Sequence, residues 1–419
     1  MDVIRTNVIL KSDIKRVLLR PFYPTTDPRV TKIIKRIQAL SEAEVNQEVQ
    51  MILTKFNHRH RGYKSFLLSR FEQILDEFRI DRNFTENRKL LIGAYFTMEY
   101  AIEAASLFNP SMVWHPDQSG LPDNSKRFII SLRATGEGHI SSLAFRSGTI
   151  NNKFQIVLER TEPYVDIPEC ELIGTGEYVL NFSTQQPISE RVIFPFINEE
   201  SNGIEDARFL HFRENDDRGI YYATYTAFDG KSIHTMLLET ADFMHFRIKK
   251  LNGLEIKNKN LSLFPRRINS QYVMLSRQDN ENNYLMFSDD LYCWDKKQLI
   301  MEPKFTWEFF QIGNCGSPIE TSEGWLVLAH GVGPMRKYVI SAFLLDLDNP
   351  TKVIGRLRNP LIESNESERE GYVPNVVYTC GGQIYNSHLI FPYAMSDYAC
   401  SFALVNIDDL LSQLKLDYK

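Results

Sequence analysis

The spacing of apolar residues changes character about a quarter of the way along the chain. Between residues 28 and 106, apolar side chains recur every three or four positions in four runs, at 30–40, 45–56, 66–78 and 90–105. This period predicts amphipathic helices. Ser41 and Thr85 each stand directly before acidic residues and have the hydroxyl side chain of a helix N-cap. We therefore expect a helical module in this part of the chain.

The segments on either side of these helical runs have the period of β-strands. Residues 1 to about 27 alternate apolar and polar positions, which predicts a strand or arm lying along another surface. After Pro110, short apolar runs alternate with turn residues to the end of the chain. A short helix is expected only at 407–414. The sequence therefore predicts a mainly β protein with an N-terminal α-helical module.

A weak internal repeat organises the β region. In each copy a strand ends in an apolar or aromatic pair, a polar turn follows, and an apolar residue closes the turn. The copies lie at 143–150, 238–246, 286–294, 344–348 and 404–410. After the first copy, which an insertion around 150–190 follows, their spacing is roughly 50 to 60 residues, the size of a four-stranded blade. We predict a five-bladed β-propeller over 106–419 after an arm and helical module over 1–105. A large sandwich or two β domains are the alternatives.

The stretch Ser201–Phe209 is the strongest candidate for chemistry. It places two adjacent carboxylates, Glu205 and Asp206, after a glycine and before Arg208, with strand-like residues on both sides. Neighbouring side chains of a strand point to opposite faces, so only one carboxylate is expected to face a given pocket. Arg208 would then share the face of Asp206 and hold it ionised or bind an anion. A surface ion pair is the alternative interpretation.

Charge and cysteine content exclude several classes of protein. The formal net charge is -5, so no bulk electrostatic attraction to nucleic acid or to an anionic membrane is expected. The five cysteines form no CxxC pair, which argues against zinc or a disulfide framework and favours a reducing compartment. The sequence has neither a signal peptide nor a run long enough to span a membrane, and we expect a cytoplasmic protein.

The common cofactor motifs are absent from the sequence. We find no HExxH, EF-hand or Walker loop, and no serine nucleophile elbow. No metal or cofactor is therefore expected. The polar residues between the predicted blades, which would converge at a propeller's central channel, become the candidates for binding and catalysis.

Several motifs in order along the β region resemble glycoside hydrolase family 130, the β-mannoside phosphorylases and inverting β-mannosidases with a five-bladed β-propeller. They are Gly203–Phe209, Leu263-Phe264-Pro265, Gly324-Trp325 with His330-Gly331-Val332, Leu344–Pro350 and Pro374–Val377. The resemblance covers about residues 106–419. It implies that Asp206 is the general acid and that inorganic phosphate attacks the anomeric carbon from the opposite face. The product would be α-mannose 1-phosphate.

The resemblance also implies a cationic phosphate cradle. Its candidates are Arg277 and His330, with Arg336 and Tyr338 beside them; where the family often has His-Arg, this chain has Ser276-Arg277. The planar guanidinium of Arg277 suits phosphate oxygens. The remaining polar candidates would bind the mannoside: Arg133, Glu137, Glu205, Arg208, Asn375 and Asp397.

Two other functions stay open on the sequence alone. An inverting β-1,2-mannosidase needs a second carboxylate as base, about 6.5–9.5 Å from the acid, and Glu137, Glu205 and Glu370 are candidates. A propeller that binds glycans or proteins without catalysis is the third reading. We favour the phosphorylase, because the hydrolytic members of the family are associated with secretion, whereas this sequence shows no export signal. The apolar faces of the helical module predict packing against the propeller or a neighbouring subunit, and the second case would make a homo-oligomer.

Overall fold

A computed structural model of the chain describes residues 1–24, 27–78, 83–183, 186–214 and 219–418. The chain forms two compact units. The β-sheet unit comprises Met1–Asp13, Glu103–Thr161 and Ile167–Lys419, and the helical unit comprises Ile14–Ile102 and Glu162–Asp166. The first 13 residues, expected with the helical module, thus lie in the β-sheet unit. The reason is that β1 (Val3–Arg5) and β2 (Leu10–Lys11) pair with β28 (Ala399–Asn406), near the other end of the chain.

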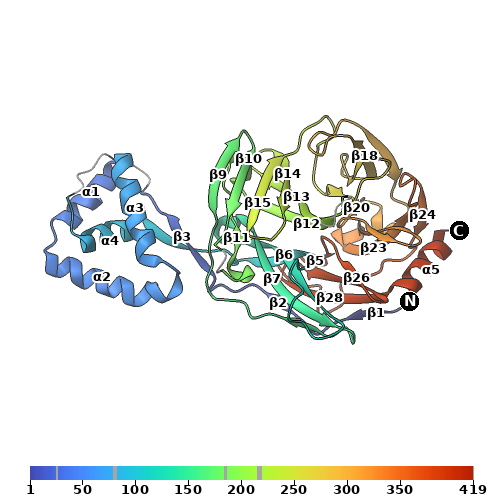
Figure 1. Cartoon of the computed structure of the whole chain (residues 1–419), viewed down its shortest axis with the longest axis horizontal. Helices are drawn as coiled ribbons and strands as arrows, with labels where there is room; N and C mark the ends of the chain where they lie inside the picture. Colours follow the sequence, from blue (N-terminus) through green and yellow to red (C-terminus); the bar gives the residue numbers. More distant parts are fainter. Residues whose placement is uncertain (25–26, 79–82, 184–185, 215–218, 419) are drawn as a thin grey trace. The chain divides into compact units, whose positions relative to one another are not determined.

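The described part of the helical unit contains four α-helices: α1 (Asp27–Gln38), α2 (Glu42–Phe56), α3 (Tyr63–Phe78) and α4 (Glu86–Tyr95) (Figure 1). Ser41 caps α2 in a capping box with Glu44, and Thr85 caps α4, as predicted. The periodic apolar residues, among them Val45, Leu67 and Phe71, form the core of this unit. Within the described residues, no helix is long and apolar enough to cross a membrane.

The fourth helix ends earlier than its predicted end, so this prediction was wrong. The helical period was expected to continue to residue 105, but α4 ends at Tyr95 and the chain turns into β4 (Thr97–Ala101). The Thr97 hydroxyl donates to the carbonyl of Gly93 at 2.8 Å, which satisfies one of the last helical carbonyls. β4 then pairs with β3 (Val17–Pro21), an edge that the local period of the sequence does not reveal.

Five antiparallel sheets make up the described part of the β-sheet unit (Figure 1). Sheet 1 contains β5 (Ser106–Trp114), β6 (Ser125–Thr135), β7 (Ser141–Asn151), β8 (Ile156–Leu158) and β11 (Val192–Ile193). Sheet 2 contains β9 (Glu169–Gly174), β10 (Glu177–Asn181), β12 (Ile204–Phe212), β13 (Ile220–Phe228), β14 (Ile233–Thr240) and β15 (His245–Lys250). Sheet 3 contains β16 (Ser262–Leu263), β17 (Tyr272–Ser276), β18 (Asn283–Ser288) and β19 (Lys297–Met301).

Sheets 4 and 5 complete the unit. Sheet 4 contains β20 (Gln311–Asn314), β21 (Ile319–Thr321), β22 (Gly324–Val332), β23 (Tyr338–Leu345) and β24 (Val353–Arg356). Sheet 5 contains β25 (Val377–Tyr378), β26 (Gln383–Tyr385), β27 (His388–Met395) and β28, together with β1 and β2. The predicted C-terminal helix is α5 (Ile407–Tyr418). Each of the five repeat segments falls on the third strand of its sheet or at the end of that strand. The strands are counted here as hydrogen-bonded neighbours, starting from β5, β12, β16, β20 and β25.

Each sheet packs on the next through a separate apolar core. Sheets 1 and 2 share the core around Phe145 and Phe209, and sheets 2 and 3 share the one around Phe212 and Met274. Two further cores join sheet 3 to sheet 4 and sheet 4 to sheet 5. Sheet 5 returns to sheet 1, where the Cys400 thiol donates to the carbonyl of Leu107. The packing of the five sheets is therefore cyclic.

Candidate active site

A β-bulge in β12 determines how Asp206 is presented. Glu205 lies opposite Thr226 and Arg208 lies opposite Thr224, so two residues of β12 face one residue of β13. Asp206, the first of the two, has a φ of 53°, in the left-handed region that non-glycine residues seldom adopt. Such strained positions concentrate at functional sites.

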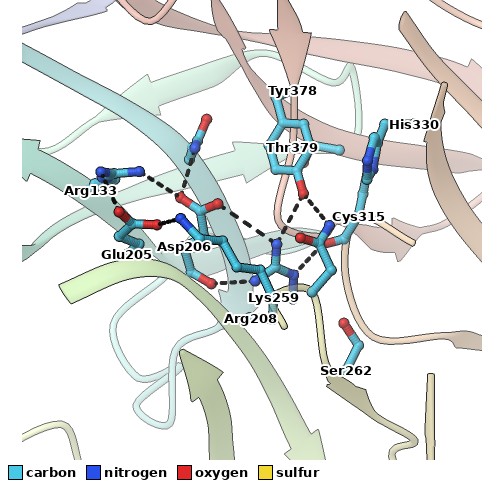
Figure 2. Close-up of polar contacts among 12 residues, drawn as sticks. Arg133, Glu205, Asp206, Arg208, Lys259, Ser262, Cys315, His330, Tyr378 and Thr379 are labelled. Carbon is cyan, nitrogen blue, oxygen red and sulfur yellow. Dashed lines mark hydrogen bonds and ion pairs between the residues drawn. The ribbon is translucent and has the colours of Figure 1, made fainter. Parts of the chain in front are cut away.

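The bulge overturns the expected alternation of the two carboxylates. Both face the same guanidinium, because Glu205 Oε1 lies 3.0 Å from Arg133 Nη2 and Asp206 Oδ1 lies 3.6 Å from Arg133 Nη1. Glu205 also pairs with the ammonium group of Lys259 (Figure 2). Glu205 is therefore held closely by two cations, whereas the nearest guanidinium nitrogens of Arg133 and Arg208 lie 3.6 Å and 3.8 Å from Asp206.

A second bulge, in β5, places an amide against Asp206. The register of β5 on β6 shifts between Phe108 and Ser111, and Asn109 within it has a φ of 49°. Asn109 Nδ2 donates to Asp206 Oδ1 at 2.7 Å across 97 residues of sequence. Two bulges on the first strands of neighbouring sheets thus turn their polar side chains toward one another.

Arg208 supports the other side of Asp206 (Figure 2). Its Nη1 donates to the backbone carbonyl of Asp206 at 2.7 Å, and its Nη2 lies 3.8 Å from Asp206 Oδ2. Arg208 is 1% exposed, and it also donates to the Tyr378 hydroxyl at 2.9 Å. Asn260 Nδ2 donates to the same hydroxyl at 2.8 Å. Tyr378 and Asn260 thereby connect the Asp206 group to the next group of polar residues.

Two carboxyl groups in this region differ in acidity. Burial alone would raise the pKa of Asp206, but the charges of Arg133 and Arg208 and the Asn109 hydrogen bond lower it below its usual value. Burial and the negative charge of Asp206 raise the pKa of Asp397 to about 6. Asp206, the stronger acid, and Asp397, the weaker acid, therefore lie within electrostatic reach of each other.

Arg277 is a buried cation with unused hydrogen-bonding capacity. Its side chain is 6% exposed, and Nε and Nη1 have no partner in the described part of the chain. Nη2 lies 3.5 Å from Asn260 Oδ1. Burial lowers the pKa of the Arg277 guanidinium, although the group stays charged. A buried guanidinium with two free donors is suited to an anionic ligand.

His330 lies beside Arg277, as the sequence predicted for one site. A Cβ added to Gly313 would stand 2.5 Å from His330 Cε1 and 3.1 Å from Arg277 Cδ. Burial and then the charges of Arg277 and Arg208 lower the pKa of His330 well below its usual value, so its ring is neutral. Its Nε2 accepts from the Gln311 amide at 3.0 Å, and its Nδ1 lies 3.9 Å from the Cys315 thiol.

Among the remaining predicted residues, Tyr338 contacts both His330 and Asn375, whereas Arg336, Glu137 and Glu370 are exposed. The Tyr338 ring stacks on His330 at 5.9 Å, and its backbone N–H donates to the carbonyl of Asn375 at 3.0 Å. Arg336 is exposed and lies 6.0 Å from the Tyr338 ring. Glu137 is exposed in a short 3-10 helix, Glu137–His139. Glu370, a predicted alternative base, lies in an exposed loop.

Five side chains without an assigned role in the predicted site contact the predicted residues. They are Asn109, Lys259, Asn260, Gln311 and Tyr378. A signal for two of them is present in the sequence, because an Asn or Asp stands on or beside the first strand of every sheet. These positions are Asn109, Asp206, Asn260, Asn314 and Asn375.

Comparison with known proteins agrees with the motifs that suggested a family. The family model described as beta-1,4-mannooligosaccharide phosphorylase, of glycoside hydrolase family 130, matches residues 174–416. A 1,2-beta-oligomannan phosphorylase from Thermoanaerobacter sp. (strain X514) is 35% identical over 216 residues, 51% of this chain and 71% of that protein. A beta-1,2-mannobiose phosphorylase from the same organism is 31% identical over 294 residues, 67% of this chain and 90% of that one.

A solved structure shares the fold of this chain. The beta-1,2-mannobiose phosphorylase from Listeria innocua, in complex with beta-1,2-mannobiose, superimposes with a TM-score of 0.55 at 20% identity. The match covers 76% of this chain and 93% of that one. At this identity the likeness concerns the fold alone. The family model and the sequence relatives carry the assignment, which confirms the predicted resemblance: the chain belongs to glycoside hydrolase family 130.

Proposed function

We propose that this chain is a β-mannoside phosphorylase. It transfers a mannosyl group from a β-linked mannoside to inorganic phosphate, with inversion, and releases α-mannose 1-phosphate. The names of its relatives support this reaction class. The observation that carries the proposal is Arg277, a buried guanidinium whose Nε and Nη1 have no protein partner among the described residues.

The region around Arg277 is built to receive a compact anion. An unpaired buried charge is unfavourable, and phosphate oxygens are suited to accept hydrogen bonds from free guanidinium donors. Neutral His330, fixed by Gln311, forms the wall beside it, so the positive charge comes from Arg277 and not from the imidazole. We assign phosphate binding to Arg277, with His330 beside it and Tyr338 stacked on His330.

We assign the general acid to Asp206. In the free chain Arg133 and Arg208 keep it ionised, whereas an acid must carry a proton when the glycosidic bond breaks. A phosphate dianion at Arg277 would oppose these positive charges and raise the pKa of Asp206, so phosphate binding would favour protonation of the acid. The Asp206 proton then goes to the leaving oxygen, the bond from C1 to that oxygen breaks, and a phosphate oxygen bonds to C1.

The arrangement disfavours hydrolysis, which needs a second free carboxylate as base. Glu205 is held by Arg133 and Lys259, and Glu137 and Glu370 are exposed. Asp397 has a pKa raised to about 6, which brings it closer to the basicity of a general base than an ordinary aspartate, so the phosphate-free arm of the experiment below also tests Asp397. We assign Asp397, Arg133 and Asn375 to sugar binding, and we place the reaction in the cytoplasm, where phosphate is abundant.

The catalytic domain in this proposal is the β-sheet unit, and its five sheets are the blades of a β-propeller. Two observations support this. Each sheet packs on the next and the fifth on the first. Strands from both ends of the chain also pair within sheet 5, which would close the ring.

The deciding experiment incubates the protein with β-1,2- and β-1,4-mannobiose, each with and without phosphate. We expect mannose 1-phosphate only when phosphate is present, and its anomeric configuration is read by NMR. Release of free mannose at equal rates in both conditions would exclude phosphorolysis. Asp206→Asn serves as the inactive control for either reaction.

A further inference from the structure

The loop between β24 and β25 encloses a single side chain, and that side chain is a carboxylate. Glu368 is 5% exposed, whereas every other residue from Glu363 to Asn375 is exposed or half-buried. Burying an ionised carboxylate is costly unless its oxygens are paired and hydrogen-bonded. The partners of Glu368 therefore show what this loop is attached to.

Both carboxylate oxygens of Glu368 accept hydrogen bonds. Oε1 accepts from the Tyr393 hydroxyl on β27 at 2.6 Å and from Arg5 Nε on β1 at 2.9 Å. Oε2 accepts from the backbone N–H of Asn365 at 3.2 Å and from Arg5 Nη2 at 3.4 Å. Arg5 Nη2 also donates to the carbonyl of Glu363 at 2.7 Å. Glu368 thus fastens the loop to two strands of sheet 5, one of them from the N-terminal arm.

The same loop holds the turn that carries Asp397. Ser396 Oγ donates to the carbonyl of Glu368 at 2.7 Å, and the N–H of Val373 donates to the carbonyl of Ser396 at 3.0 Å. A Cβ on Gly371 would stand 2.3 Å from the carbonyl oxygen of Ser396, so the loop lies directly against the turn. Ser396 and Asp397 have left-handed backbones, with φ values of 48° and 51°. Such conformations persist only where their surroundings fix them.

The position of the Asp397 carboxylate depends on this turn. Asp397 forms no hydrogen bond or ion pair with another residue in the described part of the chain. It nevertheless borders the catalytic carboxylate, because the negative charge of Asp206 helps to raise the pKa of Asp397. The backbone of the turn, and not a side-chain partner, therefore determines where the Asp397 carboxylate points.

We propose that Glu368 is a positioning residue for the mannoside: by fixing its loop it holds the Ser396–Asp397 turn, and so directs the Asp397 carboxylate at the bound sugar. The inference rests on the proposed function, which assigns Asp397 to sugar binding. A displacement of about 1 Å is enough to disrupt an interaction of this kind. Arg277, which we assign to phosphate, follows β17 in sheet 3. Loosening the Glu368 loop of sheet 5 should therefore weaken sugar binding and leave phosphate binding unchanged.

Glu308 provides a matched control for a purely structural role. It is also buried, at 0% exposed, and also pairs with one arginine, Arg356 at 2.5 Å. Its Oε1 accepts from the backbone N–H groups of Lys304 and Phe305 at 2.8 Å and 2.9 Å. Glu308 holds the segment before β20 in sheet 4, whereas Glu368 holds a loop of sheet 5. Removing either carboxylate should lower stability, but only the loss of Glu368 should weaken sugar binding.

The test measures the Kd for β-1,2- and β-1,4-mannobiose by calorimetry in the Asp206→Asn background, without phosphate and so without turnover. Glu368→Gln should raise the Kd for mannobiose about tenfold. Tyr393→Phe, which removes one hydrogen bond to Glu368 and keeps the ring, should raise it less. Glu308→Gln should leave it unchanged, although urea unfolding should show that both glutamine variants lose stability. The Kd for phosphate, titrated separately, should be the same in all variants.

Combining Glu368→Gln with Asp397→Asn tests whether Glu368 acts through Asp397. Asp397→Asn alone should raise the Kd for mannobiose, and adding Glu368→Gln should raise it no further. Independent, multiplying effects would overturn the proposal. So would an unchanged Kd in Glu368→Gln or in Asp397→Asn, or an equal loss in Glu308→Gln.

This test can fail separately from the proposed function. The coupling between Glu368 and Asp397 is measured without a nucleophile, so it would stand even if water and not phosphate attacked the sugar. If Asp206→Asn bound neither mannobiose, the assignment to mannosides would fail, and this inference with it.

Discussion

Replacing Arg277 with methionine separates a ligand-binding role of its guanidinium from a structural one. Removing a group that holds the fold together lowers the stability of the protein. A buried cation kept for a ligand does the opposite in the absence of that ligand, because its unpaired donors destabilise the free protein. Methionine keeps most of the apolar stem of Arg277 and removes the charge.

The magnitude follows from the contacts of Arg277. Two buried donors, Nε and Nη1, have no partner in the described residues, and each such group costs about 1–3 kcal/mol. We therefore expect Arg277→Met to raise the free energy of unfolding of the ligand-free protein by about 2 kcal/mol or more. Arg356 is the matched contrast, since it is also buried but pairs with Glu308 at 2.5 Å. Arg356→Met should lower stability by about 3–5 kcal/mol, because it leaves a buried carboxylate unpaired.

Urea unfolding followed by tryptophan fluorescence is the appropriate assay, because Trp114, Trp294, Trp307 and Trp325 all belong to the β-sheet unit. Phosphate at a hundredfold excess over its dissociation constant should stabilise the wild type by about 2.7 kcal/mol and Arg277→Met hardly at all. Chloride at equal ionic strength is the control. If Arg277→Met were destabilised as Arg356→Met is, and phosphate still stabilised it, Arg277 would be structural and the phosphate site would lie elsewhere.

Three further substitutions test the site. Asp206→Asn should lower kcat by about 10²–10⁴-fold while the variant still binds mannoside in calorimetry; an unchanged kcat would remove Asp206 as the acid. Because the folded-state pKa of Asp397 is raised to about 6 from 3.8, the wild type loses stability as pH rises from about 4 through 6. Asp397→Asn should therefore be more stable than the wild type at pH 8, by up to about 3 kcal/mol, and no more stable at pH 4; melting curves at both values decide. Gly313→Ala should raise KM for phosphate more than KM for mannobiose, because its methyl group would meet His330 at 2.5 Å, and equal changes would contradict the assigned geometry.

Local periodicity was enough to predict the helices and their caps, but not the geometry around Asp206. Ser41 and Thr85 cap helices where the sequence placed them, since capping depends on residues three positions apart. The orientation of Asp206 depends instead on a register shift against β13, and strand alternation predicted the wrong relation between Glu205 and Asp206. Partners such as Tyr378, 170 residues from Arg208, are set by the packing of sheets and leave no local signal.

The Asn and Asp residues at the five first-strand positions explain how a single catalytic carboxylate can be sufficient in this site. Asn260 and Asn314 join two sheets by reciprocal bonds, from Asn314 Nδ2 to the Asn260 carbonyl at 2.8 Å and from Asn260 Nδ2 to the Asn314 carbonyl at 3.1 Å. Neutral amides at such positions satisfy backbone groups without adding charge. Asp206 alone replaces the amide by an ionisable group, and Asn109 from the preceding sheet directs it. Phosphate is already a nucleophile, so phosphorolysis needs one proton donor and one cationic pocket. The other four equivalent positions are all occupied by asparagine, so the second carboxylate that hydrolysis needs would have to come from outside this set of positions.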